Sequence, residues 1–269
     1  MTSGKKARRE RQTVNRPPVR STGGRKASPK VLAIVAIAIA VAAVAAVIVF
    51  VVAGRGSGSS GSSNLATTTG ASALPDAAAV IKGFEGIPQH GNVLGSPNAP
   101  VTMVQYIDLQ CPICRAFETE VMPTIISRYV RDGKVKVVTR PVDFLGAESE
   151  LGRRAALSAG LQNHLSEFSQ LMYANQGPEN SGWLNDNLVS AAYASIPGLD
   201  AQTALASRTS PPVLAQEKAF DKRATSDQVL GTPTVLVGKS GGRLTNVSPG
   251  GAPDVAVLTA AIKRAQASG

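Results

Sequence analysis

The feature that most constrains the fold is a predicted strand, followed at once by a turn with two cysteines and a helix. Residues 101–107 (VTMVQYI) carry the apolar and aromatic side chains typical of a strand. Cys111 and Cys114, the only two cysteines of the 269-residue chain, follow in the order Cys-Pro-Ile-Cys. Pro112 suits the first position of a helix, because the N–H group that it lacks would have no partner there. Apolar residues at helical spacing continue through residues 117–130.

This spacing predicts that Cys111 lies exposed at a helix N-terminus, with Cys114 shielded one turn further on. Free N–H groups and the positive end of the helix dipole favour a thiolate there. The dipole alone lowers the pKa by about one unit or less. Further stabilisation must come from the backbone N–H groups of Ile113 and Cys114 and from the Cys114 thiol. The pattern indicates a redox pair, with Cys111 as the nucleophile and Cys114 as the resolving thiol.

Three other uses of the cysteines are less favoured. A structural zinc site needs four ligands, and the chain adds only His90 and His164, at no ligand-like spacing. A purely structural disulfide would close a very small loop and constrain little of the unfolded chain. Two inert buried thiols fit poorly at a helix start, which is a polar place. We therefore expect no metal and no cofactor beyond a redox-active Cys111–Cys114 disulfide.

The first 53 residues predict a membrane anchor. Residues 1–30 hold ten Lys and Arg against one Glu, a net charge of +9. Residues 31–269 carry +1 (18 basic minus 17 acidic), so we expect no nucleic-acid binding by the body. Residues 31–53 contain no charged or polar side chain and can cross a bilayer as one helix. The basic tail places residues 1–30 in the cytoplasm and the remainder outside. A cleaved signal peptide is the alternative, although its apolar core is usually shorter, about 7–15 residues.

The rest of the chain reads as a Gly/Ser/Thr linker, 54–75, and one folded body, 76–269. In the body, a second strand at 135–140 gives a strand–helix–strand unit with parallel pairing, and Pro123 is expected to kink its helix. A helical block covers about 148–226, where Leu157, Leu161, Leu165, Phe168 and Met172 form one apolar stripe. A late strand at 235–237, a hairpin partner at 243–247 and a last helix to about 266 complete the order. The predicted fold is α/β, a thioredoxin-like fold with a helical insertion, preceded by one transmembrane helix.

With these motifs in place, the chain resembles the DsbA-like thiol–disulfide oxidoreductases, in particular membrane-anchored bacterial ones. The resemblance covers about residues 86–265. It is carried by the following stretches: Asp108 to Cys114, Arg140-Pro141, Asn175-Gln176, Trp183-Leu184 and Gly231-Thr232-Pro233-Thr234. Cys-x-x-Cys together with Gly-Thr-Pro-Thr before a late strand is a specific combination.

The resemblance implies roles for several residues. Pro233 would be cis and face the cysteine pair, with Thr232 offering backbone hydrogen bonds to an extended substrate. Family members usually carry a buried acid six residues before the first cysteine, which helps to move the proton of the second. Here that position is Gln105, which cannot take a proton. Asp108 either substitutes for it or only shapes the turn. The dipeptide Pro112-Ile113 lacks the histidine of strongly oxidising members.

The function that follows is an extracytoplasmic, single-pass membrane thiol–disulfide oxidoreductase that introduces disulfides into exported proteins. Its expected partners are exported proteins with cysteines, the lipid bilayer and, for an oxidase, a quinone-linked membrane partner. One alternative is a reductase or isomerase of envelope disulfides, such as those of cytochrome maturation. Another is a non-catalytic module that uses the peptide groove of the fold.

Overall fold

The structure, a computed structural model, describes residues 73–267. Within these residues one sheet has the strand order β1-β2-β4-β3-β5-β6. The strands have these bounds: β1 Gln89–His90, β2 Val93–Leu94, β3 Val101–Ile107, β4 Val135–Pro141, β5 Thr234–Lys239 and β6 Thr245–Asn246. The central strand β3 pairs in parallel with β4 and antiparallel with β5. The predicted parallel unit and the predicted late hairpin are both confirmed.

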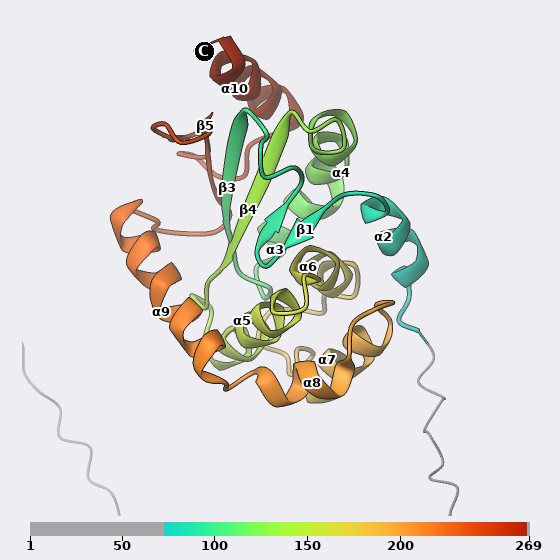
Figure 1. The fold of residues 1–269 in the computed structure, drawn as a ribbon. Coiled ribbons are helices and arrows are strands. Elements are labelled where there is room, and N and C mark those ends of the chain that lie inside the picture. The colour runs from blue at the N-terminus through green and yellow to red at the C-terminus, as the bar shows by residue number, and fades with distance from the viewer. Residues whose placement is uncertain (1–72, 268–269) are drawn as a thin grey trace, which may run out of the picture. The chain divides into compact units, whose positions relative to one another are not determined.

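From α3 onward the described helices follow the predicted order along the chain, whereas α2, before them, was not predicted. They have these bounds: α2 Ala77–Phe84, α3 Pro112–Ala116, η1 Phe117–Val121, α4 Met122–Ile125, η2 Ile126–Val130, α5 Ala147–Gly160, α6 Leu165–Ala174, α7 Asp186–Ala194, α8 Ala201–Ser207, α9 Pro211–Ser226 and α10 Val255–Ala267. In Figure 1, α5 to α8 gather at the end of the sheet where β3 finishes, and α10 lies near the opposite end.

The strand β3 is buried on both faces, which explains its nearly continuous apolar sequence. Val101 and Met103 belong to the core between the sheet, α4 and α10. Val104 and Tyr106 belong to a second core on the other face. Because the strand is fixed on both sides, the turn that follows it leaves the sheet at a well-defined point.

The helix after that turn continues past Pro123, as predicted, but not as a regular α-helix. Two π-helical turns, η1 and η2, flank the short α4 segment that contains Pro123. A proline inside a helix lacks an N–H donor and crowds the preceding turn, and wider turns accommodate it.

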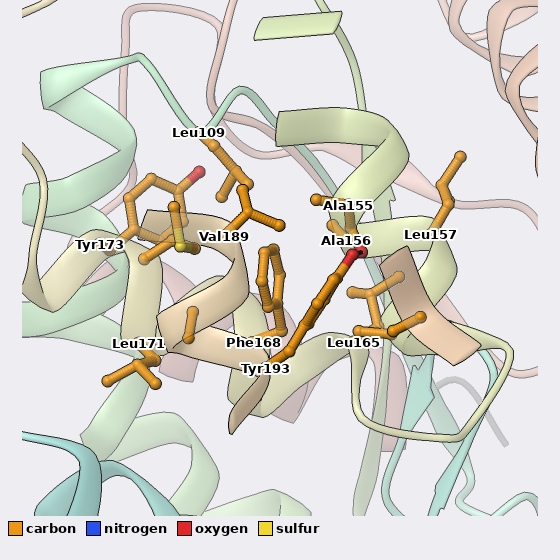
Figure 2. Packing of buried hydrophobic residues seen from close by; sticks show 14 of the residues in the cluster. Leu109, Ala155, Ala156, Leu157, Leu165, Phe168, Leu171, Tyr173, Val189 and Tyr193 are labelled. Carbon is orange, nitrogen blue, oxygen red and sulfur yellow. Dashed lines mark hydrogen bonds between the residues drawn. The ribbon is translucent and has the colours of Figure 1, made fainter. Parts of the chain in front are cut away.

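The helical insertion, α5 to α9, has its own core, in which Phe168 and Tyr193 pack with ring centroids 5.0 Å apart (Figure 2). The single apolar stripe predicted across this region is wrong at Leu161. Helix α5 ends at Gly160, Asn163 takes a left-handed φ of 67°, and α6 begins at Leu165. Leu161 therefore lies in the connecting turn, with 45% of its surface exposed.

Two parts of the sequence before β3 differ from the expectation or lie beyond the described residues. The turn-rich stretch before β3 contains the short β1–β2 hairpin, which the sequence did not indicate. The predicted tail, transmembrane helix and most of the linker lie outside the described residues. Among residues 73–267, none of the helices combines the length and the apolar character needed to cross a membrane.

Candidate active site

The two cysteines lie at the start of α3, just after β3 ends. We call residues 108–111, which connect these two elements, the redox turn. Cys111 is the N-cap of α3, with an extended backbone (φ −72°, ψ 118°), and Pro112 occupies the first helical position, as predicted. The backbone N–H of Cys114 donates to Cys111 Sγ at 3.4 Å. The two thiols are not bonded to each other. Cys114 is fully buried, but Cys111 keeps only 6% of its surface exposed, so the predicted open position of Cys111 is corrected.

The surroundings move the pKa values of the two thiols apart. The hydrogen bond with the Cys114 thiol, together with Thr232 and the backbone of Cys114 and Ile113, lowers the pKa of Cys111 to about 6, although burial opposes it. Burial raises the pKa of Cys114 well above its usual range, and the Cys111 thiol adds to this. At neutral pH the pair therefore holds one thiolate, on Cys111, and one thiol, on Cys114.

The loop before β5 supplies the third part of the site. The Thr232–Pro233 peptide bond is cis, as the resemblance implies. Cys111 Sγ lies 3.4 Å from the carbonyl oxygen of Thr232, to which its thiol donates when it is protonated. An ion pair of 3.0 Å between Arg140 on β4 and Asp227 at the end of α9 fixes the start of this loop against the sheet. The loop and the cysteines meet although they are far apart in the sequence.

Beneath the cysteine pair lies a carboxyl group that the sequence did not indicate as functional, that of Glu118. It is buried, one helical turn after Cys114, and accepts a hydrogen bond of 2.7 Å from Gln105 Nε2. Burial raises the pKa of Glu118 to about 8, despite the hydrogen bond from Gln105. A signal was present in the spacing, because Glu118 follows Cys114 by four residues, which in a helix places the two side chains near each other.

The Gln105–Glu118 pair borders a small cavity of about 10 Å³. Its lining is mixed: Thr139, Ser166 and Ser169 are polar, and five further residues are apolar. Within the described part of the chain, Gln105 Oε1 and Ser169 Oγ have no hydrogen-bond partner, although both are buried. A cavity of this size and polarity can hold about one water molecule.

Asp108, the other candidate acid, is engaged in shaping the turn. Its carboxylate accepts hydrogen bonds from the backbone N–H of Gln110 at 2.9 Å, the backbone N–H of Leu145 at 3.1 Å and Ser149 Oγ at 2.7 Å. Burial raises the pKa of Asp108, while these hydrogen bonds lower it. Of the two roles left open for Asp108, the contacts favour the structural one.

Three large apolar side chains are exposed on segments that border the site. Ile113 lies between the cysteines and is 54% exposed. Phe144, 47% exposed, precedes the residue whose N–H binds Asp108. Leu230, 95% exposed, lies two residues before Thr232. Exposed apolar residues gathered on one region of a surface are typical of contact sites for polypeptides.

Among residues 73–267 no group of three or more potential metal ligands is present. The site instead consists of a stabilised thiolate, a buried thiol and a cis-proline loop at the end of a thioredoxin-like sheet. This arrangement defines a class of proteins, the thiol–disulfide oxidoreductases.

Comparison with known proteins places the chain within that class. A family model described as Thioredoxin matches residues 89–245, more than half of the chain, and the chain belongs to this family. A probable disulfide bond formation protein D of Bacillus cereus is 29% identical over 147 residues, which cover 54% of this chain and 68% of the relative. The chain is a thiol–disulfide oxidoreductase, and the non-catalytic module is set aside.

Solved structures agree on the fold. The oxidised BdbD of Bacillus subtilis superposes with a TM-score of 0.57 at 22% identity, covering 68% of this chain and 93% of that one. A thioredoxin-like oxidoreductase of Silicibacter pomeroyi superposes with a TM-score of 0.54 at 25% identity, covering 73% and 100%. These likenesses confirm the mixed α/β, thioredoxin-like fold with a helical insertion.

Proposed function

We propose that this oxidoreductase is an oxidase, which donates the Cys111–Cys114 disulfide to cysteine-containing exported proteins. The observation that carries the proposal is the low pKa of Cys111, about 6. A stabilised thiolate favours the reduced form of the pair, which makes the disulfide a better oxidant. The printed name of the Bacillus cereus relative, a disulfide bond formation protein, supports the same direction.

The proposed reaction runs through a mixed disulfide. A substrate thiolate attacks Cys111 Sγ, the Cys111–Cys114 bond breaks, and its electron pair leaves on the sulfur of Cys114. The second thiolate of the substrate then attacks the substrate sulfur of the mixed disulfide. This forms the substrate disulfide and releases Cys111 as a thiolate. The substrate loses two electrons and the cysteine pair gains them.

Glu118 is suited to supply the proton that Cys114 needs when it leaves. A thiolate buried at that position is unfavourable, because burial raises the pKa of Cys114. With a pKa of about 8, Glu118 carries a proton at neutral pH. The charges of Cys114 and Glu118 both act on the Tyr173 hydroxyl, so the two groups share one buried environment. The acid that family members place at position 105 is therefore replaced by one on the helix.

The substrate would bind across the exposed apolar residues and the cis-proline loop. Ile113, Phe144 and Leu230 offer apolar contact to a polypeptide that is not yet folded, and Thr232 and Pro233 offer the backbone beside Cys111. Such contacts do not depend on a particular sequence, which suits a protein that serves many substrates.

The proposed location is the outer side of the cell membrane. The basic tail, 1–30, and the uncharged segment, 31–53, support a single anchor with a cytoplasmic N-terminus. The chain would be reoxidised by a membrane partner, linked to quinones, whose identity no residue of this chain reveals.

The reduction potential of the Cys111–Cys114 pair tests the proposal, and equilibration of the purified protein with glutathione buffers measures it. We expect a value between those of thioredoxin, about −270 mV, and DsbA, about −120 mV. This follows from the pKa of Cys111, which lies between the values of about 7 and about 3.5 for those two proteins. A value at or below about −270 mV would instead support the reductase alternative.

A further inference from the structure

The redox turn is held from outside the thioredoxin-like core, by the helical insertion. The contacts come from residues 173–183, which we call the α6–α7 segment. The Tyr173 hydroxyl donates to the carbonyl oxygen of Asp108 at 3.0 Å. Gln176 Nε2 donates to the carbonyl oxygen of Leu109 at 2.8 Å. Three more contacts reach the side chain of Gln110, so every residue from 108 to 110 is bound by this one segment.

The side chain of Gln110 is fully buried and makes its hydrogen bonds with the insertion alone. Trp183 Nε1 donates to Gln110 Oε1 at 2.7 Å, and the backbone N–H of Asn180 donates to the same oxygen at 3.2 Å. Gln110 Nε2 donates to Asn180 Oδ1 at 3.4 Å. A Cβ atom at Gly177 would lie 2.7 Å from the Cβ of Trp183, so the segment folds closely back on itself.

Gln176 reaches the reactive residue itself. Its Nε2 also donates to the carbonyl oxygen of Cys111 at 3.2 Å, and the same oxygen accepts the backbone N–H of Arg115 at 3.1 Å. The backbone of Cys111 is thus held between the first turn of α3 and the insertion. Cys111, Cys114 and Leu109 also belong to the buried cluster of the insertion, with Tyr173 and Leu109 drawn in Figure 2.

We propose that Gln176 is a positioning residue for Cys111, through which the helical insertion sets the reactivity of the cysteine pair. The proposal rests on the proposed role of Cys111 as the nucleophile. Gln176 does not touch the sulfur and acts through the carbonyl oxygens on either side of Gln110.

The physical link runs through the N-cap geometry. Cys111 Sγ accepts the N–H of Cys114 only while the Cys111 backbone stays extended. When the amide of Gln176 is removed, two carbonyl oxygens lose a donor and the backbone of Cys111 gains freedom to rotate. The sulfur then spends less time beside its donors, and its thiolate is less favoured.

The experiment compares two neighbouring side chains at the end of α6. Gln176→Met keeps the size of the side chain and removes its donor. Asn175→Leu is the matched control, since Asn175 Nδ2 binds the carbonyl oxygens of Pro75 at 3.0 Å and Leu171 at 2.9 Å, not the redox turn. Each variant, full-length, reduced and in detergent, is alkylated with iodoacetamide across pH 4–9. The chain has two cysteines, and mass spectrometry assigns the label to Cys111 or Cys114.

We expect the midpoint of the Cys111 profile to rise by about one pH unit in Gln176→Met. The thiolate fraction at pH 6 then falls about fivefold, and alkylation slows accordingly. Asn175→Leu should keep the wild-type profile, even if it loses as much stability against urea. A loss of stability alone does not shift the pH profile of Cys111 alkylation in the folded protein. The midpoint therefore distinguishes positioning of Cys111 from a general stabilisation of the fold.

Two outcomes count against the proposal, and they are distinguishable. A low midpoint in the wild type that Gln176→Met leaves unchanged would overturn the inference alone. An ordinary midpoint in the wild type, about 8.5, would overturn the proposed nucleophile and the inference with it. If Gln176→Met does not fold, Trp183→Phe removes one donor to Gln110, keeps an aromatic ring, and must show the same shift.

Discussion

Glu118 shows how a side chain that looks ordinary in a sequence can be buried in the fold and carry a strongly shifted pKa. In the chain it stands among apolar helix positions and reads as one more surface glutamate. In the fold it is buried beside Gln105, and its pKa rises to about 8. The family resemblance places the acid six residues before Cys111, on the strand, where this chain has Gln105. The sequence does not show that Glu118, on the helix, brings a carboxyl group into contact with Gln105.

The raised pKa of Glu118 predicts how stability depends on pH. Because the folded state holds the proton up to about pH 8 and the unfolded state loses it near pH 4.5, the folded protein binds more protons between these values. The contribution of protonated Glu118 to the free energy of unfolding is fully present below about pH 4.5 and is lost as pH rises to 8. Glu118→Gln should therefore be more stable than the wild type at pH 9, by up to about 5 kcal/mol, since each pKa unit corresponds to about 1.4 kcal/mol. Urea unfolding of the reduced protein at pH 5, 7 and 9 measures this.

The same variant tests the proposed proton transfer. Glu118→Gln cannot supply a proton to Cys114, so formation of the mixed disulfide from the oxidised protein should slow at pH 7. Thr119→Gln, at the next helix position, is a control, since Thr119 is half-buried and its hydroxyl donates to the carbonyl oxygen of Arg115. Equal rates in Glu118→Gln and the wild type would assign the proton to water or another group.

The two cysteines make a third prediction at this scale. Cys114→Ser leaves Cys111 able to form a mixed disulfide and removes the thiol that resolves it. This variant should accumulate covalent complexes with exported proteins. They should appear on a gel run without reductant and disappear when reductant is added. Cys111→Ser should trap few, because Cys114 is fully buried and its pKa lies well above the usual range. Equal trapping by both variants would contradict the assignment of nucleophile and resolving thiol.

At the scale of elements, the loop between α9 and β5 combines two tasks. Arg140 and Asp227 hold its start, and Thr232 reaches Cys111, while Leu230 projects into solvent. A fixed backbone with an exposed apolar side chain suits the substrate contact proposed above, because a leucine exposed this fully adds no buried apolar area to the fold.

Leu230→Ser should therefore weaken substrate binding and leave the chemistry intact. We expect KM for a cysteine-containing unfolded protein to rise several-fold, with kcat within about twofold of the wild type. Leu161→Ser, at an exposed leucine in the turn after α5, should change neither constant. Steady-state oxidation of the unfolded protein provides both values. A fall in kcat with unchanged KM would show that the loop acts on the cysteines instead.

Most elements could be predicted from the sequence because their signals are local. The strand β3, the N-cap at Cys111, the cap of α8 by Asp200 and the start of α9 at Pro211 all follow from neighbouring residues. What failed depends on distant contacts. The near-complete burial of Cys111 follows from packing against the insertion, and no local pattern encodes it. The break at Leu161 has a local cause, the left-handed turn at Asn163, which the regular apolar spacing obscured. The contacts of Gln110 and Gln176 appear only when the fold brings the redox turn and the insertion together.

For the whole molecule, the unequal charge along the chain predicts its orientation. With +9 in residues 1–30 and +1 in the remainder, the tail should stay in the cytoplasm and residues 76–269 should lie outside. Protease added to cells with a permeable outer layer should digest the body and spare the tail. N-terminal sequencing is the complementary measurement, and a mature protein that begins near Gly54 would show a cleaved signal instead of an anchor.

The contact between Cys111 and Thr232 joins residues 121 positions apart, and this bears on the order in which the site forms. The cysteine pair is synthesised well before β5, the strand that completes the site. Contacts so distant in sequence form late in folding, because a long loop must close first. Until then Cys111 has the donors of its own helix start, the Cys114 thiol and the N–H groups of Ile113 and Cys114, but not Thr232. The full stabilisation of its thiolate is thus reached only when β5 has joined the sheet.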